Sequence, residues 1–330
     1  MAARQGLMAR SFRLAAGGYR DAVGGRMSSD SLRRITEGWG EQVERQREER
    51  AEQALRPVES PRERPIAEVA PIAGQANLST DGGMVLIREE GWKEVKLTAI
   101  SEVEVRPAKE RRSGEKVSRR AQDLIVMLKG HSYQAGLWEA DEMARHQYSE
   151  GVRRGIDLCQ RLSSVNDGAV WIQRITAFNF PSAVQIVDWR HASERLLKVS
   201  QAVFGERTLR GKEWVERQRD SLWEGHVKSV ERALEALDLA QEKWPDEVRQ
   251  ARGYFSNNRK RMRYDLFRQA GYAIGSGTVE SGINTVVHHR MRRPGRGWSR
   301  DNGQAMLAGL GELHSGRFDQ AWQESLPLAT

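Results

Sequence analysis

The spacing of hydrophobic residues changes along this chain, and the changes predict its elements. Over residues 1–54 and 192–270, apolar residues recur every three or four positions, which is the spacing of one face of a helix. Between residues 76 and 190, shorter segments alternate apolar and polar residues, and turn residues separate them. This order predicts an α/β protein with an N-terminal helical segment and a long helical stretch in its second half.

The N-terminal segment predicts two helices. One spans residues 13–23, and the next begins soon after it, where Ser and Asp residues are N-cap candidates. Leu32, Ile35 and Trp39 lie on one face of the second helix. Because Gly24-Gly25 joins the two, they are either part of a helix-turn-helix that binds DNA or a helical hairpin that packs on the main domain.

A proline-rich stretch and three extended segments come next. Residues 55–75 carry four prolines among mixed charges, which predicts a linker. Three strands of a meander follow, at residues 77–88, 92–103 and 124–128. A turn at Glu90-Gly91 joins the first two strands, and a charged loop joins the second to the third.

From residue 138 onward, helices and strands are predicted to alternate. Helices are expected at residues 138–162 and 170–178. A short strand between them ends in the turn Asp167-Gly168, and another strand within residues 181–191 runs into the next helix. Residues 301–323 predict one or two closing helices.

A glycine-rich segment, Ile274-Gly-Ser-Gly-Thr-Val-Glu-Ser281, predicts the start of one more helix. Thr278 is the expected N-cap, so that Glu280 lies in the first turn. The apolar face of this helix consists of Val279, Ile283, Val286 and Val287.

The composition fits a protein with a substantial core and excludes several classes. Of the 330 residues 38% are hydrophobic, yet no apolar run approaches the roughly 18 residues of a membrane span. The N-terminus carries arginines but no apolar signal core, so we expect a cytoplasmic protein. The single cysteine, Cys159, excludes an intramolecular disulfide and a cysteine-cluster zinc site, and we expect it to be buried in a helix.

Positive charge is concentrated in one stretch of the sequence. Residues 259–300 contain ten Lys or Arg residues and two acids, a net charge of +8 that equals the charge of the whole chain. Such a concentration is typical of a surface that binds the phosphate backbone of nucleic acid, although a solvated surface face is the alternative. The expected DNA-binding residues are Arg259, Lys260, Arg261, Arg263, Arg290, Arg292, Arg293, Arg296, Trp298 and Arg300.

Three acids are candidates for metal-assisted chemistry. Asp81 lies in the first strand, Asp167 follows a later strand, and Glu280 starts a helix. Ligands gather at strand ends in α/β sheets, and Mg²⁺ prefers carboxylate oxygens. An acid in the first strand of a meander, one after the fourth strand and one on a late helix is the layout of an RNase H-like nuclease core.

Each acid also has a structural interpretation. Asp81-Gly82 and Asp167-Gly168 are ordinary turn dipeptides, and Glu280 favours a helix N-terminus through the helix dipole. Asp188 and His191, at a strand–helix junction, are either a metal pair or a hydrogen-bonded pair that fixes the junction. Trp298 either stacks on an unpaired base or belongs to the core.

Several longer motifs resemble a known family. They are Asp167-Gly-Ala-Val-Trp-Ile172, Phe180-Pro-Ser-Ala-Val-Gln-Ile-Val-Asp-Trp-Arg-His191, Gly271-Tyr-Ala-Ile-Gly-Ser-Gly-Thr-Val-Glu-Ser281 and the Arg290-to-Ser299 stretch. From about residue 76 onward, the chain is similar to bacterial insertion-sequence transposases of the Kra type. These belong to the DDE, RNase H-like, Mutator-like group.

The resemblance implies a fold and a chemistry. The fold would be an RNase H-like mixed sheet flanked by helices over residues 76–330, with residues 192–270 as the helical insertion. Asp81, Asp167 and Glu280 would hold two Mg²⁺ or Mn²⁺ ions, and Asp188 with His191 would support the site.

The same resemblance implies the partners. The protein would cleave double-stranded DNA at the terminal repeats of its element and transfer the strands to target DNA. Bringing two ends together implies a homo-oligomer, bound to the nucleoid in the bacterial cytoplasm.

Two other functions fit the same sequence. An RNase H-like nuclease or resolvase would cut DNA without joining it. A decayed transposase would only bind DNA, without any metal-dependent cleavage.

Overall fold

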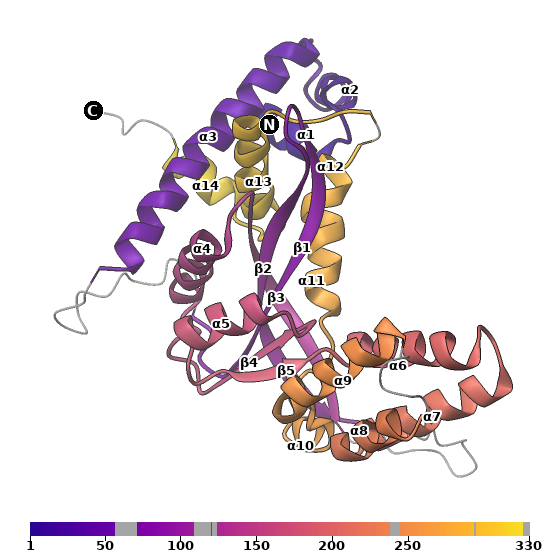
Figure 1. Ribbon diagram of the computed structural model, residues 1–330. Helices are drawn as coiled ribbons and strands as arrows, with labels where there is room; N and C mark the ends of the chain where they lie inside the picture. The colour runs from indigo at the N-terminus through magenta and orange to yellow at the C-terminus, as the bar shows by residue number, and fades with distance from the viewer. Residues whose placement is uncertain (57–70, 109–119, 121–123, 238–244, 294, 326–330) are drawn as a thin grey trace.

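The computed structural model describes residues 1–56, 71–108, 120, 124–237, 245–293 and 295–325. At its centre is a five-stranded mixed sheet of order β3-β2-β1-β4-β5, flanked by helices (Figure 1). The strands are β1 (Gln75–Ile87), β2 (Gly91–Pro107), β3 (Leu124–Gly136), β4 (Arg161–Asn166) and β5 (Val184–Val187). The predicted α/β class is therefore confirmed.

The first three strands form the predicted antiparallel meander, while β4 and β5 run parallel to β1. The third strand is longer than the predicted 124–128, because it continues to Gly136, which pairs with Lys96 of β2. Most of the predicted linker, residues 57–70, lies outside the described residues, as does most of the loop before β3.

The two faces of the sheet bury different sets of side chains. Val85 and Ile87 of β1 pack in one cluster under α13, whereas Ala76 and Leu78 belong to another cluster with residues near α4. This division follows from the alternation of side chains along a strand. One face carries α11 (Gly277–Gly282), the π-helical η3 (Ile283–His288), α12 (His289–Met291) and α13 (Arg300–His314). The other carries α4 (Ala140–Arg153) and α5 (Val170–Asn179) (Figure 1).

The N-terminal helices pack on the first of these faces. They are α1 (Ala2–Met8), α2 (Phe12–Val23) and α3 (Ser29–Ala54), and α14 (Phe318–Glu324) closes the chain beside them. Gly40 lets α3 approach α13 closely, because a Cβ there would lie 2.3 Å from the Ala305 carbonyl oxygen. Leu32 and Trp39 are buried as predicted, but Ile35 is 38% exposed, since Thr36 takes the core-facing position instead.

The helical stretch after β5 forms a separate lobe with its own hydrophobic cluster (Figure 1). Its helices are α6 (Trp189–Phe204), α7 (Leu209–Trp223), α8 (Val227–Glu235), α9 (Asp246–Asn258), the 3-10 helix η2 (Arg259–Met262) and α10 (Tyr264–Gln269). The prediction of a helical stretch over residues 192–270 is therefore confirmed for the described residues.

The predicted helix over residues 138–162 is wrong in its second half. Helix α4 ends at Arg153, and Gly155 adopts a left-handed conformation with φ +66° that a helix does not continue through. Cys159 consequently lies half-buried in the turn before β4, outside any helix.

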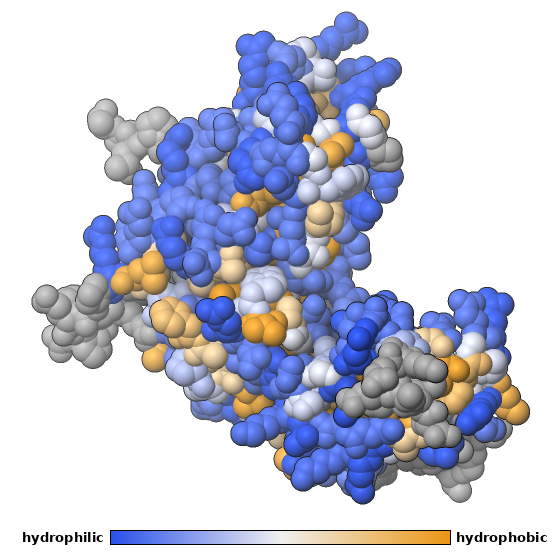
Figure 2. Space-filling model, viewed as in Figure 1, coloured by the Kyte–Doolittle hydropathy of each residue, from blue (hydrophilic) through white to orange (hydrophobic). Residues whose placement is uncertain are grey.

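The visible surface in Figure 2 is mainly hydrophilic, with small separate hydrophobic patches. Among the described residues, no helix is both long enough and apolar enough to cross a membrane.

Candidate active site

The order of the strands brings Asp81 and Asp167 to the same level of the sheet. Strands β1 and β4 are parallel neighbours in which Leu78 pairs with Ser164, and each aspartate follows its paired residue by three positions. The Asn166 side chain fixes this end, because its Oδ1 accepts a hydrogen bond from the Thr80 backbone N–H at 2.7 Å.

Asp81 lies within β1, where it is paired with Leu97 of β2. The interpretation of Asp81-Gly82 as a turn is therefore wrong, since both residues belong to a continuous strand. One carboxylate oxygen of Asp81 accepts a hydrogen bond from the Gly82 N–H at 2.8 Å. Two glycines let the helical run that begins with α11 approach the sheet closely. A Cβ on Gly83 of β1 would lie 2.9 Å from Ile283, and one on Gly282 of α11 would lie 2.8 Å from Tyr133.

The pKa of Asp81 reports the surroundings of its carboxyl group. Burial raises this pKa, the Gly82 N–H lowers it, and the negative charges of Asp167 and Glu280 raise it further. The ring of His191 lowers this pKa, by less than Asp167 raises it and by more than Glu280 does. The net pKa lies above the ordinary value mainly because of burial, and the negative charges of Asp167 and Glu280 add to this rise.

Asp167 follows β4 in the turn that the sequence predicts. Its Oδ1 accepts a hydrogen bond from the Ala169 N–H at 2.8 Å, while Gly168 supplies the positive φ of +96°. Tyr254 of the helical lobe donates its hydroxyl to the Asp167 carbonyl oxygen at 2.9 Å. The turn and a role in the site are compatible, because only one carboxylate oxygen has a partner in the turn.

Glu280 lies in the first turn of α11, as predicted. The N-cap is Ser276 and not Thr278, because the buried carboxylate of Asp188 accepts the Ser276 N–H and fixes the chain there. The carboxylate of Glu280 contacts Arg190 Nη1 at 2.7 Å and His191 Nε2 at 3.6 Å. Both partners come from the first turn of α6.

Asp188 connects the elements that carry the other groups. It is 1% exposed and caps α6 by accepting the His191 N–H at 2.8 Å. The neighbouring Trp189 N–H bonds to the Ile274 carbonyl oxygen at 2.9 Å. Both carboxylate oxygens of Asp188 are therefore used to join α6 to α11, which is the structural interpretation of the Asp188–His191 pair.

The acids at β1, β4 and α11 have the donor chemistry for a hard divalent ion, but their carboxylate oxygens are more widely spaced than those of a compact single-ion site. In the described part of the chain, only one group of three His, Cys, Asp or Glu residues has its ligand atoms within 4.8 Å of one another, and it lies elsewhere. Two ions bridged by one carboxylate need a wider spacing than one ion does. The mutual repulsion at Asp81 is the feature that a cation would relieve.

The compact group consists of Glu48, Glu142 and His146, which the sequence did not reveal. His146 lies one helical turn after Glu142, and its Nε2 is 3.0 Å from Glu48 Oε1. This cluster could hold a metal ion. Arg145, however, lies 3.4 Å from the second oxygen of Glu48 and competes with a metal for that carboxylate.

The basic stretch, continuous in the sequence, divides into two groups at opposite ends of the molecule (Figure 1). The first group lies in and directly after η2, which contacts β5; there Arg259 pairs with Glu231 at 2.8 Å and Arg263 with Asp265 at 3.1 Å. Lys260 is exposed. Burial lowers the pKa of Arg261, and Tyr254 and, to a lesser extent, Asp167 partly offset this effect.

The second group follows α12 at the other end of β1. Arg300 pairs with Glu90 at 2.7 Å, and Arg292 lies 5.6 Å from the centre of the Trp92 ring. Trp298 packs against the core and donates its ring N–H to the Met291 carbonyl oxygen at 3.0 Å, which is the interpretation of Trp298 as a core residue. Arg290, Arg293 and Arg296 line a pocket with this ring.

Three residues near the acids were missed as site residues. Arg190 stands between Asp188 and His191 in the Phe180-to-His191 motif, and that position is the sequence signal for its pairing with Glu280. Tyr254 and Arg195, whose guanidinium lies 5.2 Å from the Tyr254 ring, come from distant helices. No periodic pattern in the sequence marks those two.

Comparison with known proteins gives no assignment. No protein-family model matches the chain, and no curated protein matches it.

Proposed function

We propose that the chain is a metal-dependent DNA transposase. The observation that carries the proposal is the convergence of Asp81, Asp167 and Glu280, whose mutual repulsion contributes to the raised pKa of Asp81. The strand order supports the finer assignment to the RNase H-like fold, since three antiparallel strands are followed by two parallel ones.

The three carboxylates would hold two Mg²⁺ or Mn²⁺ ions. When bound about 4 Å apart, such ions stabilise the attacking and leaving oxygens of an in-line phosphoryl transfer. Cleavage would free a 3′-hydroxyl at each element end, and that hydroxyl would then attack target DNA. Three carboxylates form a hard, all-oxygen donor set, which favours Mg²⁺ or Mn²⁺ over zinc.

The surrounding residues orient these acids. Asp188 holds the start of α11 and so fixes the position of Glu280. Arg190 neutralises Glu280, and because its side chain is 67% exposed, it can leave that carboxylate at little cost. Once released, Arg190 would contact a phosphate of the DNA, as would the half-buried Arg261 near Asp167.

The experiment separates metal binding from catalysis. Mn²⁺ binding is measured by calorimetry for the wild type, Asp81→Asn and Asp167→Asn, with the exposed Asp21→Asn as matched control. Glu48→Gln reports on the compact Glu48–Glu142–His146 cluster. We expect the two site variants to lose binding and the two others to retain it. Binding lost only in Glu48→Gln would refute the assignment.

Cleavage and joining are then measured on a labelled duplex carrying the two ends of the DNA segment that encodes the chain. We expect Asp81→Asn and Asp167→Asn to lose at least about 100-fold in rate. Asp188→Asn should lose about 10- to 100-fold, as positioning residues of metal sites do. Cleavage without joining would favour a nuclease or resolvase, and binding without cleavage would favour a protein that only binds DNA.

A further inference from the structure

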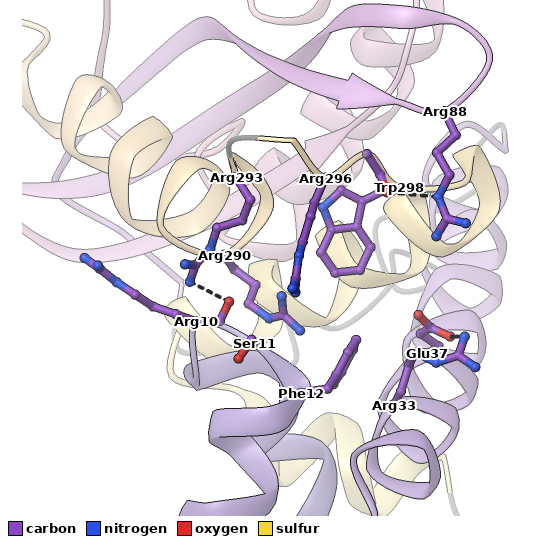
Figure 3. Close-up of a pocket in the computed structure, with 11 residues that line it drawn as sticks. Arg10, Ser11, Phe12, Arg33, Glu37, Arg88, Arg290, Arg293, Arg296 and Trp298 are labelled. Carbon is purple, nitrogen blue, oxygen red and sulfur yellow. Dashed lines mark hydrogen bonds and ion pairs between the residues drawn. The ribbon is translucent and has the colours of Figure 1, made fainter.

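A pocket rich in arginine lies at the far end of the helical run that begins with α11. Its volume is about 440 Å³, and it is lined by α2, α3, the turn after β1 and the segment following α12 (Figure 3). Six arginines and one acid, Glu37, face it, together with the rings of Phe12 and Trp298. Glu280 and Arg290 are ten residues apart on this run, which corresponds to roughly 15 Å along a helix.

Arg290 is the centre of the pocket's chemistry. It is 3% exposed, and its Nε donates to the Gly6 carbonyl oxygen at 3.0 Å. Its Nη2 is buried without any hydrogen-bond partner. The guanidinium lies 4.4 Å from the centre of the Phe12 ring and 5.1 Å from that of Trp298. The rings compensate a buried cation only in part.

The other arginines of the pocket add positive charge, and most of them have no carboxylate partner. Within the described residues, no carboxylate forms an ion pair with Arg88, Arg290, Arg293 or Arg296, and Arg10 likewise has none. Glu37 instead pairs with Arg33 at 3.2 Å on the opposite wall (Figure 3). A buried charge without a counter-charge is costly, so the pocket is suited to an anion that brings one.

We propose that this pocket binds a phosphate of the DNA strand that the acids cut. The proposal rests on the proposed function for the identity of that strand. Phosphates of one duplex strand follow one another at about 3.4 Å along the axis, so 15 Å corresponds to about four nucleotides from the cleaved bond. The arginine fork is suited to phosphate oxygens, and the N-terminal segment contributes five of the eleven residues that line the pocket.

The test measures binding of a labelled 20-base-pair duplex in EDTA, where the metal site plays no part. Arg296→Ala and Arg290→Met should each bind about 10- to 100-fold more weakly, and the salt dependence of binding should decrease by about one phosphate contact. The exposed Arg45→Ala, on α3 away from the pocket, is the matched control. Equal affinities for the two pocket variants and the control would overturn the proposal.

Two further arms identify the ligand and isolate the site. Micromolar ATP or pyrophosphate that displaces the duplex would overturn the assignment to DNA and indicate a free phosphorylated molecule. A wild type that binds the duplex in EDTA but does not cleave it with Mn²⁺ would contradict the proposed catalysis alone, whereas pocket variants that bind as the control does would contradict the pocket alone. Arg296 is exposed, so its variant tests the pocket even where Arg290→Met does not fold.

Discussion

Two arginines of this molecule are almost equally buried in opposite surroundings. Arg317 is 6% exposed and contacts Glu150 at 2.9 Å and Glu312 at 2.7 Å, whereas Arg290 is 3% exposed and has no carboxylate partner. Burial lowers the pKa of both. The two glutamates reverse this for Arg317 and raise its pKa above the ordinary value. For Arg290, burial and the charge of Arg293 lower the pKa to about 10, and the charge of Glu37 offsets them only in part.

The presence or absence of carboxylate partners distinguishes the structural charge of Arg317 from the charge of Arg290, which is suited to a ligand. Glu312 also contacts Arg153 at 2.8 Å, so the buried acids and bases around Arg317 neutralise one another and join α4 to α13 and the start of α14. Arg290 lies in a pocket where positive charge prevails. Burial alone therefore does not tell what an arginine does, but the presence or absence of its counter-charge does.

The largest expected effect comes from removing one member of the balanced set. Arg317→Met leaves Glu150 and Glu312 buried with fewer cations, and we expect unfolding to cost about 3–5 kcal/mol less. Arg290→Met removes a buried charge that has no ion-pair partner and that Glu37 offsets only in part, so its free energy of unfolding should stay within about 1 kcal/mol of the wild type or rise. Urea unfolding measures both. Similar losses of unfolding free energy in the two variants would show that both arginines are structural charges.

Acidity gives the second test. Burial raises the pKa of Glu312, but Arg317 and Arg153 outweigh it and lower the pKa to about 2. Because the folded-state pKa is depressed, the stabilisation is present above the ordinary glutamate pKa and is lost as pH falls toward 2. The shift corresponds to about 3 kcal/mol.

The measurement is Tm between pH 7 and pH 2.5. The wild type should lose stability steeply below about pH 4.5, and Glu312→Gln should lose less over that range, from a lower starting stability. Glu41→Gln, an exposed position on α3, serves as control. A pH profile of Glu312→Gln parallel to the wild type would show that the network does not govern acid unfolding.

Local patterns predicted the elements that position the acids. Alternation gave the meander with Asp81 in its first strand, and the Asp167-Gly168 turn marked the end of β4. The polar sequence of β4 is compatible with burial because its serines have partners. Ser163 donates to Asn77 Oδ1 at 2.9 Å, and Asn166 donates to Ser164 at 2.8 Å.

Contacts between distant segments were beyond prediction. Because Asp188 accepts the Ser276 N–H, α11 begins two residues earlier than its predicted N-cap, Thr278, implies. The partners in the Arg317 network likewise lie far apart in the sequence. Charge counting treated residues 259–300 as one basic surface. The fold divides it, because the glycine-rich segment before α11 leads from the helical lobe back to the sheet (Figure 1).

The smallest expected effect concerns the single acid of the arginine pocket. Burial raises the pKa of Glu37, and Arg33 offsets this only in part, so the folded-state pKa lies above the ordinary value. Ionised Glu37 therefore opposes an incoming phosphate and occupies Arg33, and its ionisation costs stability as pH rises through the raised pKa. Glu37→Gln should bind the 20-base-pair duplex about three- to tenfold more tightly at pH 7.5.

The pH dependence of this change makes the prediction specific. Lowering the pH should bring the affinity of the wild type toward that of Glu37→Gln, because protonation removes the same charge from the pocket. Glu49→Gln, three turns further along α3 and exposed, should keep the affinity of the wild type at every pH. Weaker binding by Glu37→Gln would mean that Glu37 helps to hold the arginines in place, and Arg290 would then belong with Arg317 among the structural charges.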